Sequence, residues 1–108
     1  MPHYLLQASY TGDGWKAQVG NPEDAVSRVR SAIEGLGGSI ESVYYAFGDD
    51  DIIAIVEFPD NIAAASFSVA GSAGGAVKSI KTTPLMTMAE GVQVMQKAAG
   101  AGYRPPGS

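Results

Sequence analysis

Apolar and polar residues follow two kinds of spacing along the chain, and these spacings predict strands and helices. Short runs that are mostly apolar or alternate, and are rich in β-branched and aromatic residues, predict four strands, at residues 3–10, 39–47, 51–58 and 76–83. Apolar residues that recur every three or four positions predict three helices, within residues 21–38, 61–73 and 87–100. The segment between the first strand and the first helix, residues 11–20, is rich in turn residues and is predicted to be a loop.

Capping residues mark where the predicted helices begin. Asn21 is a suitable N-cap for the first helix and Asp60 for the second, because a short polar side chain can accept a hydrogen bond from a free N–H of the first turn. Thr87 and Glu90 have the spacing of a capping box at the start of the third helix. Pro84 is expected to end the fourth strand, since proline has no N–H for the ladder.

The order of the elements predicts the fold. Strand, helix, strand, strand, helix, strand and one further helix is the βαββαβ order of the α+β ferredoxin-like fold with an extra C-terminal helix. We expect one domain over residues 1–100 and a Gly/Pro-rich tail over residues 101–108. Helices cover only one face of such a sheet, whereas strands 3–10 and 51–58 are apolar on both faces. A second copy is the simplest cover for the other face, so the sequence predicts a homodimer.

Composition and charge narrow the possible classes of function. The chain has 108 residues, the size of one domain, and a net charge of −4 with scattered basic residues, so nucleic acid is not an expected partner. The absence of cysteine excludes disulfides and thiolate metal ligands, and no apolar run is long enough to span a membrane. We therefore expect a cytoplasmic protein that uses no metal or other cofactor and does not act at a membrane.

Three segments of the chain resemble the small bacterial proteins of the GYD domain family. They are MPHYLLQASYTGDGWK (1–16), YYAFGDDDIIAIVEFPDN (44–61) and AGGAVKSIKTTPLMTMAEGV (73–92). The pattern of the family in the hairpin is like G-x-Y-D; here Gly48 and Asp51 match, and Asp50 stands where the tyrosine is expected. The resemblance implies a ferredoxin-like domain of the dimeric α/β-barrel kind and no settled biochemical activity. Related barrels include cofactor-free monooxygenases, isomerases and ligand-sensing modules.

Three consecutive aspartates form the predicted turn between the second and third strands. Carboxylates about 7 Å apart in water repel by only about 0.6 kcal/mol, so a solvated turn needs no counter-ion. The stretch GDDD supplies neither the number nor the spacing of oxygen ligands that calcium requires. Asp49 and Asp50 are expected in solvent. Asp51 begins an apolar strand and can be drawn partly inside, where a raised pKa would suit a general base.

One histidine and several aromatic residues are the other candidates for a site. His3 can serve as a general base, with Asp51 as the alternative base, or as a haem ligand, or it can be a packing residue at the rim of the sheet. Tyr10, Trp15 and Tyr44 can line a ligand site, or they can be core or dimer contacts, because aromatic rings bury large areas.

Three functions are compatible with these residues. The first is a homodimeric α/β-barrel protein that binds a small, largely apolar molecule between sheet and helices. The second is a cofactor-independent enzyme of the monooxygenase or isomerase kind, with His3 or Asp51 as catalytic base. The third is a structural or regulatory assembly module. Whether the protein is an enzyme stays open at this point.

Overall fold

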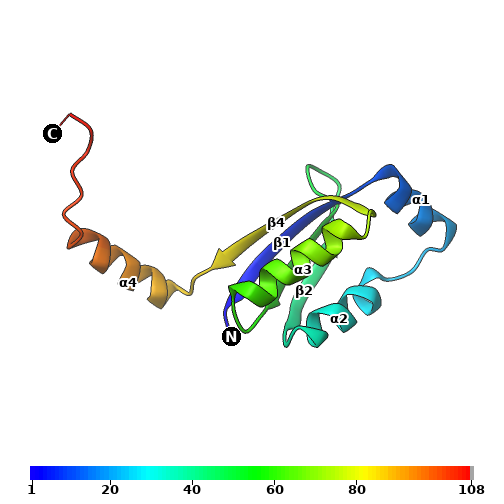
Figure 1. The fold of residues 1–108 in the computed structure, drawn as a ribbon, viewed down its shortest axis with the longest axis horizontal. Helices are drawn as coiled ribbons and strands as arrows, with labels where there is room; N and C mark the ends of the chain where they lie inside the picture. Colours follow the sequence, from blue (N-terminus) through cyan, green and yellow to red (C-terminus); the bar gives the residue numbers. More distant parts are fainter. Residues whose placement is uncertain (108) are drawn as a thin grey trace.

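A four-stranded antiparallel sheet forms the centre of the protein, whose computed structural model describes residues 1–107. Its strands are β1 (His3–Tyr10), β2 (Ser39–Tyr45), β3 (Ile52–Glu57) and β4 (Val77–Leu85), in the order β2-β3-β1-β4. The helices are α1 (Gly12–Gly20), α2 (Ala25–Gly35), α3 (Asn61–Ala73) and α4 (Met88–Ala99) (Figure 1). The order and the central position of β1 and β3 confirm the predicted α+β ferredoxin-like fold with an added C-terminal helix.

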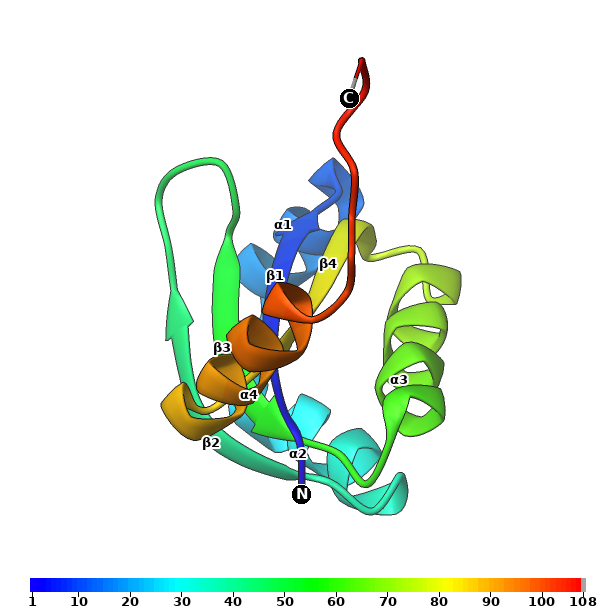
Figure 2. The same cartoon turned by 90° about the vertical axis from the view of Figure 1, so that its left-hand side faces the viewer.

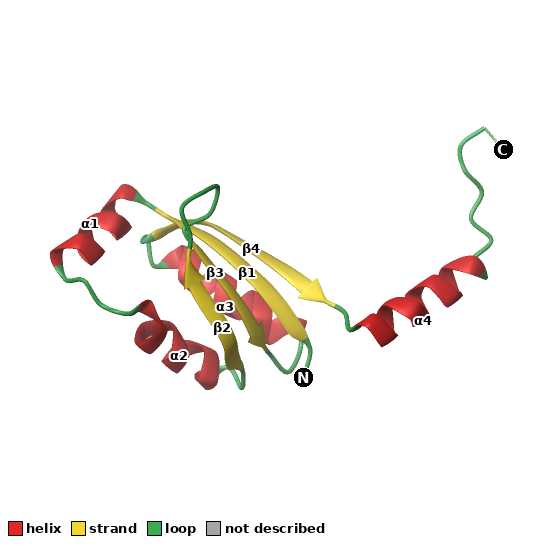
Figure 3. Ribbon diagram, turned by 180° about the vertical axis from the view of Figure 1, so that it is seen from behind, coloured by secondary structure: helices red, strands yellow, loops and turns green. Residues whose placement is uncertain are grey.

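The core lies between the sheet and the pair of helices α2 and α3, which cover one of its faces (Figure 3). Tyr4 and Val56 contribute from the central strands, and Ile33 of α2 and Ala64 of α3 meet them. Phe58, which follows β3, is fully buried and packs edge-on against Tyr4, with ring centroids 5.9 Å apart. This packing holds α2 and α3 in place on the sheet.

The predicted loop at residues 11–20 is wrong, because residues 12–20 form α1. Thr11 caps this helix: its hydroxyl oxygen accepts a hydrogen bond from the Gly14 N–H at 3.0 Å. Glycine inside a helix costs about 1 kcal/mol relative to alanine, so the glycines of this segment argue for a loop when only the sequence is considered. Trp15 offsets this by packing its ring against Tyr10, with centroids 5.1 Å apart.

Two predicted boundaries also move. The N-cap of α2 is Asp24 and not Asn21; the Asp24 carboxylate accepts from the Val26 N–H at 2.7 Å, and the helix begins after it. The fourth strand does not end before Pro84 but continues to Leu85, and Pro84 pairs with Tyr4 of β1. The strand β4 is an edge strand, where proline is tolerated because one side of the strand has no ladder.

The other predicted helix starts are confirmed. Asp60 caps α3, with its carboxylate accepting from the Ala63 N–H at 2.9 Å. Thr87 and Glu90 form the capping box of α4, with bonds of 2.9 and 3.1 Å. Hydrogen bonding of the Glu90 carboxyl to the backbone N–H of Thr87, and then to the Thr87 side chain, holds its pKa below the ordinary value.

The helix α4 stands away from the rest of the chain, beyond the end of the sheet (Figures 1 and 3). Figure 2 views the protein from that end, with α4 in front of the sheet. None of its residues, all of which the structure describes, is buried. The radius of gyration is 17.3 Å, against about 13 Å for a compact chain of this length. Residues 101–107 continue from α4 without helix or strand, and Ser108 lies outside the described residues.

Candidate functional site

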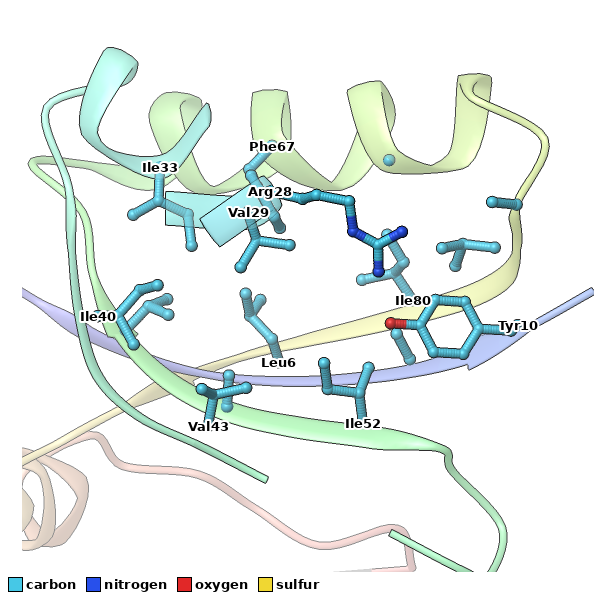
Figure 4. Close-up of a pocket in the computed structure, with 16 residues that line it drawn as sticks. Leu6, Tyr10, Arg28, Val29, Ile33, Ile40, Val43, Ile52, Phe67 and Ile80 are labelled. Carbon is cyan, nitrogen blue, oxygen red and sulfur yellow. The ribbon is translucent and has the colours of Figure 1, made fainter. Parts of the chain in front are cut away.

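A pocket of about 210 Å³ lies between the sheet and the helices α2 and α3 (Figure 4). Its walls are almost entirely hydrocarbon. The floor comes from the sheet residues Leu6, Ala8, Ile40, Val43, Ile52, Ala54 and Ile80, and the roof from Val29, Ile33 and Phe67. Two polar groups reach this space, the hydroxyl of Tyr10 and the guanidinium of Arg28, and they lie together at one end of it (Figure 4).

Arg28 is held at the mouth of the pocket by two long polar contacts. Its Nε atom is 3.6 Å from Glu23 Oε1, and its Nη2 atom donates to Gln18 Oε1 at 3.4 Å. The same Gln18 oxygen accepts from the Tyr45 hydroxyl at 3.2 Å. The side chain of Arg28 is 46% exposed, so the guanidinium has contact with both solvent and the pocket.

Tyr10 is 9% exposed and forms the inner side of the same mouth. Burial raises the pKa of its hydroxyl, and Tyr45 and Asp51 act in the same direction, whereas Arg28 opposes them. The hydroxyl is therefore a neutral donor at pH 7. The backbone N–H of Tyr10 donates to Asp51 Oδ2 at 2.9 Å, which fixes the residue at the point where β1 ends.

The helix α1 packs closely on the segment before β4 at Gly14. A Cβ atom at position 14 would overlap the carbonyl oxygen of Ala76. We expect Gly14→Ala to lower the free energy of unfolding by about 1–3 kcal/mol, because the backbone of Ala76 has to move. Gly12→Ala in the same helix meets open space and should be neutral or slightly stabilising. Urea unfolding of the two variants measures this difference, and equal stabilities would contradict the contact.

The two predicted catalytic bases are not brought together. His3 lies on the face of the sheet away from α2 and α3, with Nε2 3.2 Å from Glu41 Oε2 and 3.6 Å from Glu57 Oε1. Asp51 lies at the opposite end of β1, where its N–H donates to Ala8 O at 2.8 Å. At about 3.4 Å per residue along the strand, this places the two side chains roughly 20 Å apart. They cannot act together on one small substrate within a protomer.

The aspartate turn differs from the prediction at Asp50. Asp50 was expected in solvent but is only 7% exposed, whereas Asp49 is exposed and Asp51 is intermediate. Its Oδ2 atom is 3.0 Å from Lys81 Nζ and accepts from Gln7 Nε2 at 3.3 Å. Asp50 is buried because the hairpin loop folds back over β1. This brings its carboxylate to the side chains of Gln7 and Lys81 on the open face of the sheet. Sequence spacing alone does not bring Lys81 of β4 to this turn.

The predicted aromatic ligand residues separate into three positions. Tyr10 lines the pocket. Trp15 packs behind the Tyr10 ring, outside the lining, and so supports it from α1. Tyr44 is 70% exposed and stands beside Ile53 on the open face of the sheet, so it does not reach the pocket.

Arg28 is the site residue that the sequence did not single out. It stands three residues after buried Ala25 and next to Val29, on the flank of the apolar stripe of α2. A cation at the edge of a buried stripe is the available signal in the sequence, but it does not stand out among several scattered basic residues. Its partner Gln18 lies in α1, which the sequence predicts to be a loop.

Other classes of site have less support. Within residues 1–107, no group of three or more histidine, aspartate or glutamate side chains is arranged to hold a metal ion. No helix in that part of the chain is both long and apolar enough to cross a membrane.

Fold and pocket together define an α+β ferredoxin-like protein with an apolar pocket between its sheet and its helices. Residues 4–95 of the 108 match the GYD domain family, so the chain belongs to this family. The comparison with curated proteins found no match.

Proposed function

We propose that the protein binds a small, largely apolar molecule in the pocket between the sheet and the helices α2 and α3. The observation that carries this proposal is a pocket of about 210 Å³ walled by aliphatic and aromatic side chains. An apolar cavity of about 150 Å³ in a protein stays dry and holds benzene, so this pocket has room for a somewhat larger molecule. Sites for drug-sized ligands begin at about 300 Å³, which limits the ligand to a small compound.

Titration with toluene, followed by the amide signals of ¹⁵N-labelled protein, tests this proposal. We expect saturable shifts confined to residues around the pocket, such as Leu6, Ile52 and Phe67. The variant Ala8→Leu places three more carbons in the pocket and should weaken toluene binding by about tenfold or more.

The matched control is Ala65→Leu, the same change on the exposed side of α3, which should bind toluene as the wild type does. Wild-type protein without saturable shifts would contradict the proposal. Equal binding by the two variants would place the toluene elsewhere.

A cofactor-independent enzyme receives less support from the geometry. The pocket contains no carboxylate or imidazole among its described lining residues, and His3 and Asp51 lie at opposite ends of β1. The Tyr10 hydroxyl is neutral at pH 7 and is a hydrogen-bond donor, not a base. Binding is therefore the better supported class.

We also propose that the protein is a homodimer in which a second copy covers the open face of the sheet. Leu5, Ile53 and Ile55 form an apolar row on that face, and they are only partly buried in the single chain. The helix α4 carries a separate apolar stripe that is largely exposed in the single chain, formed by Met88, Val92 and Met95. An isolated helix of 12 residues is marginal in water, which favours a partner for this stripe. In a dimer with two-fold symmetry, each copy can cover the open sheet face and the α4 stripe of the other.

A further inference from the structure

The mouth of the pocket carries two polar groups, whereas its walls are hydrocarbon. Tyr10 is nine-tenths buried, and its hydroxyl points into the pocket (Figure 4). No residue of the described chain forms a hydrogen bond with that hydroxyl. The hydroxyl oxygen is not one of the fully buried polar atoms, since every such side-chain atom in residues 1–107 has a partner, so it is open to the space at the mouth. It can therefore donate a hydrogen bond to an acceptor of a ligand placed there.

The guanidinium of Arg28 faces the same point from the other side of the mouth (Figure 4). An arginine carries five N–H donors, and the contacts to Glu23 and Gln18 occupy two of them. Both contacts are long, at 3.6 and 3.4 Å, so the guanidinium is not fully committed to its present partners. Donors remain for an acceptor from the ligand.

The charges around the mouth also limit how negative that acceptor can be. Glu23 lies against Arg28, and Asp51 lies near Tyr10. A group with two negative charges, such as a phosphate, would meet both carboxylates with only one cation to offset them. A single carboxylate would take its two hydrogen bonds from Arg28 and one from the Tyr10 hydroxyl at lower cost.

We infer that the ligand is a small monocarboxylic acid, with its apolar body in the pocket and its carboxylate at the mouth between Arg28 and Tyr10. This inference rests on the proposed function, since it assigns a chemical class to the ligand of the same pocket. Arg28 and Tyr10 are then the residues that determine specificity, and the hydrocarbon walls supply general affinity.

A pair of isosteric probes, 3-phenylpropanoate and 3-phenylpropanamide, separates the carboxylate contribution from the apolar one. Titration of the ¹⁵N-labelled wild-type protein should show the acid binding about tenfold more tightly than the amide, the size of one charge-assisted hydrogen-bonded pair at a half-exposed site. This preference should shrink at high salt, because the pair is partly screened. Arg28→Gln should bring the acid to the affinity of the amide and leave the amide unchanged. Tyr10→Phe should cost the acid about threefold.

The control variant is Arg30→Gln, which removes an exposed charge of the same helix that pairs with Glu34 and does not line the pocket. It should keep the preference for the acid. Binding of acid and amide with equal affinity to the wild type, or equal losses for both probes in Arg28→Gln, would overturn the inference and leave the apolar site intact. Failure of toluene and both probes to bind would instead overturn the proposed function, and the inference with it.

Discussion

Replacing Phe58 with alanine is expected to lower the free energy of unfolding by about 3–5 kcal/mol, the usual cost of truncating a buried phenylalanine. The ring is 0% exposed and packs against both Tyr4 and Phe67, with centroids 5.9 and 6.0 Å away. Domains of this size are stable by about 5–15 kcal/mol, so the loss is a large share of the total. The melting temperature should fall by at least about 10 °C in calorimetry.

The control for this change is Phe47→Ala in the hairpin loop. Phe47 is 100% exposed, so its removal should change the stability by less than about 0.5 kcal/mol. Because Phe67 also lines the pocket, Phe58→Ala should weaken toluene binding as well. If the two variants melted together, the packing of α3 on the sheet through Phe58 would be refuted.

The second large effect is expected from the apolar stripe of α4. Val92→Glu combined with Met95→Glu should raise the dissociation constant of the proposed homodimer by at least about a hundredfold, since unpaired carboxylates would be buried against the partner. Sedimentation velocity should show a dimer for the wild type and a monomer for the variant. The fold of each monomer should persist, because α4 does not pack on its own core.

Gln93→Glu with Gln96→Glu provides the matched control, since it adds the same charge to the same helix beside the stripe. This variant should remain dimeric at the same concentration. A monomeric wild type would count against the dimer itself. A charged stripe that left the dimer unchanged would show that the open face of the sheet associates without α4.

Periodicity and capping predict most of the fold because they are local. The helix α3 coincides with its predicted bounds, and the capping box at Thr87 is formed as expected. The helix α1 was missed because its glycines argue against a helix locally, and the favourable contact of Trp15 with Tyr10 cannot be read from that segment alone. The error therefore lies where tertiary packing outweighs propensity.

The site was predicted less well than the fold, for a physical reason. Tyr10 could be proposed because a tyrosine at a strand end is a common site residue, and the pocket does contain it. Arg28 required knowing how α2 lies on the sheet, and the burial of Asp50 required the register of β4 against β1, which brings Lys81 alongside Gln7. Contacts between residues distant in sequence depend on the assembled sheet, and no spacing in the chain encodes them directly.

The aspartate turn has a mechanical consequence for the pocket. Asp50 ties the hairpin loop to Gln7 and Lys81, and Asp51 ties it to the backbone of Tyr10. The loop is therefore fastened to two strands at once and cannot swing outward on its own. An opening of the loop that breaks these bonds also removes the hydrogen bond at the Tyr10 backbone, so we expect the loop and the mouth of the pocket to open together.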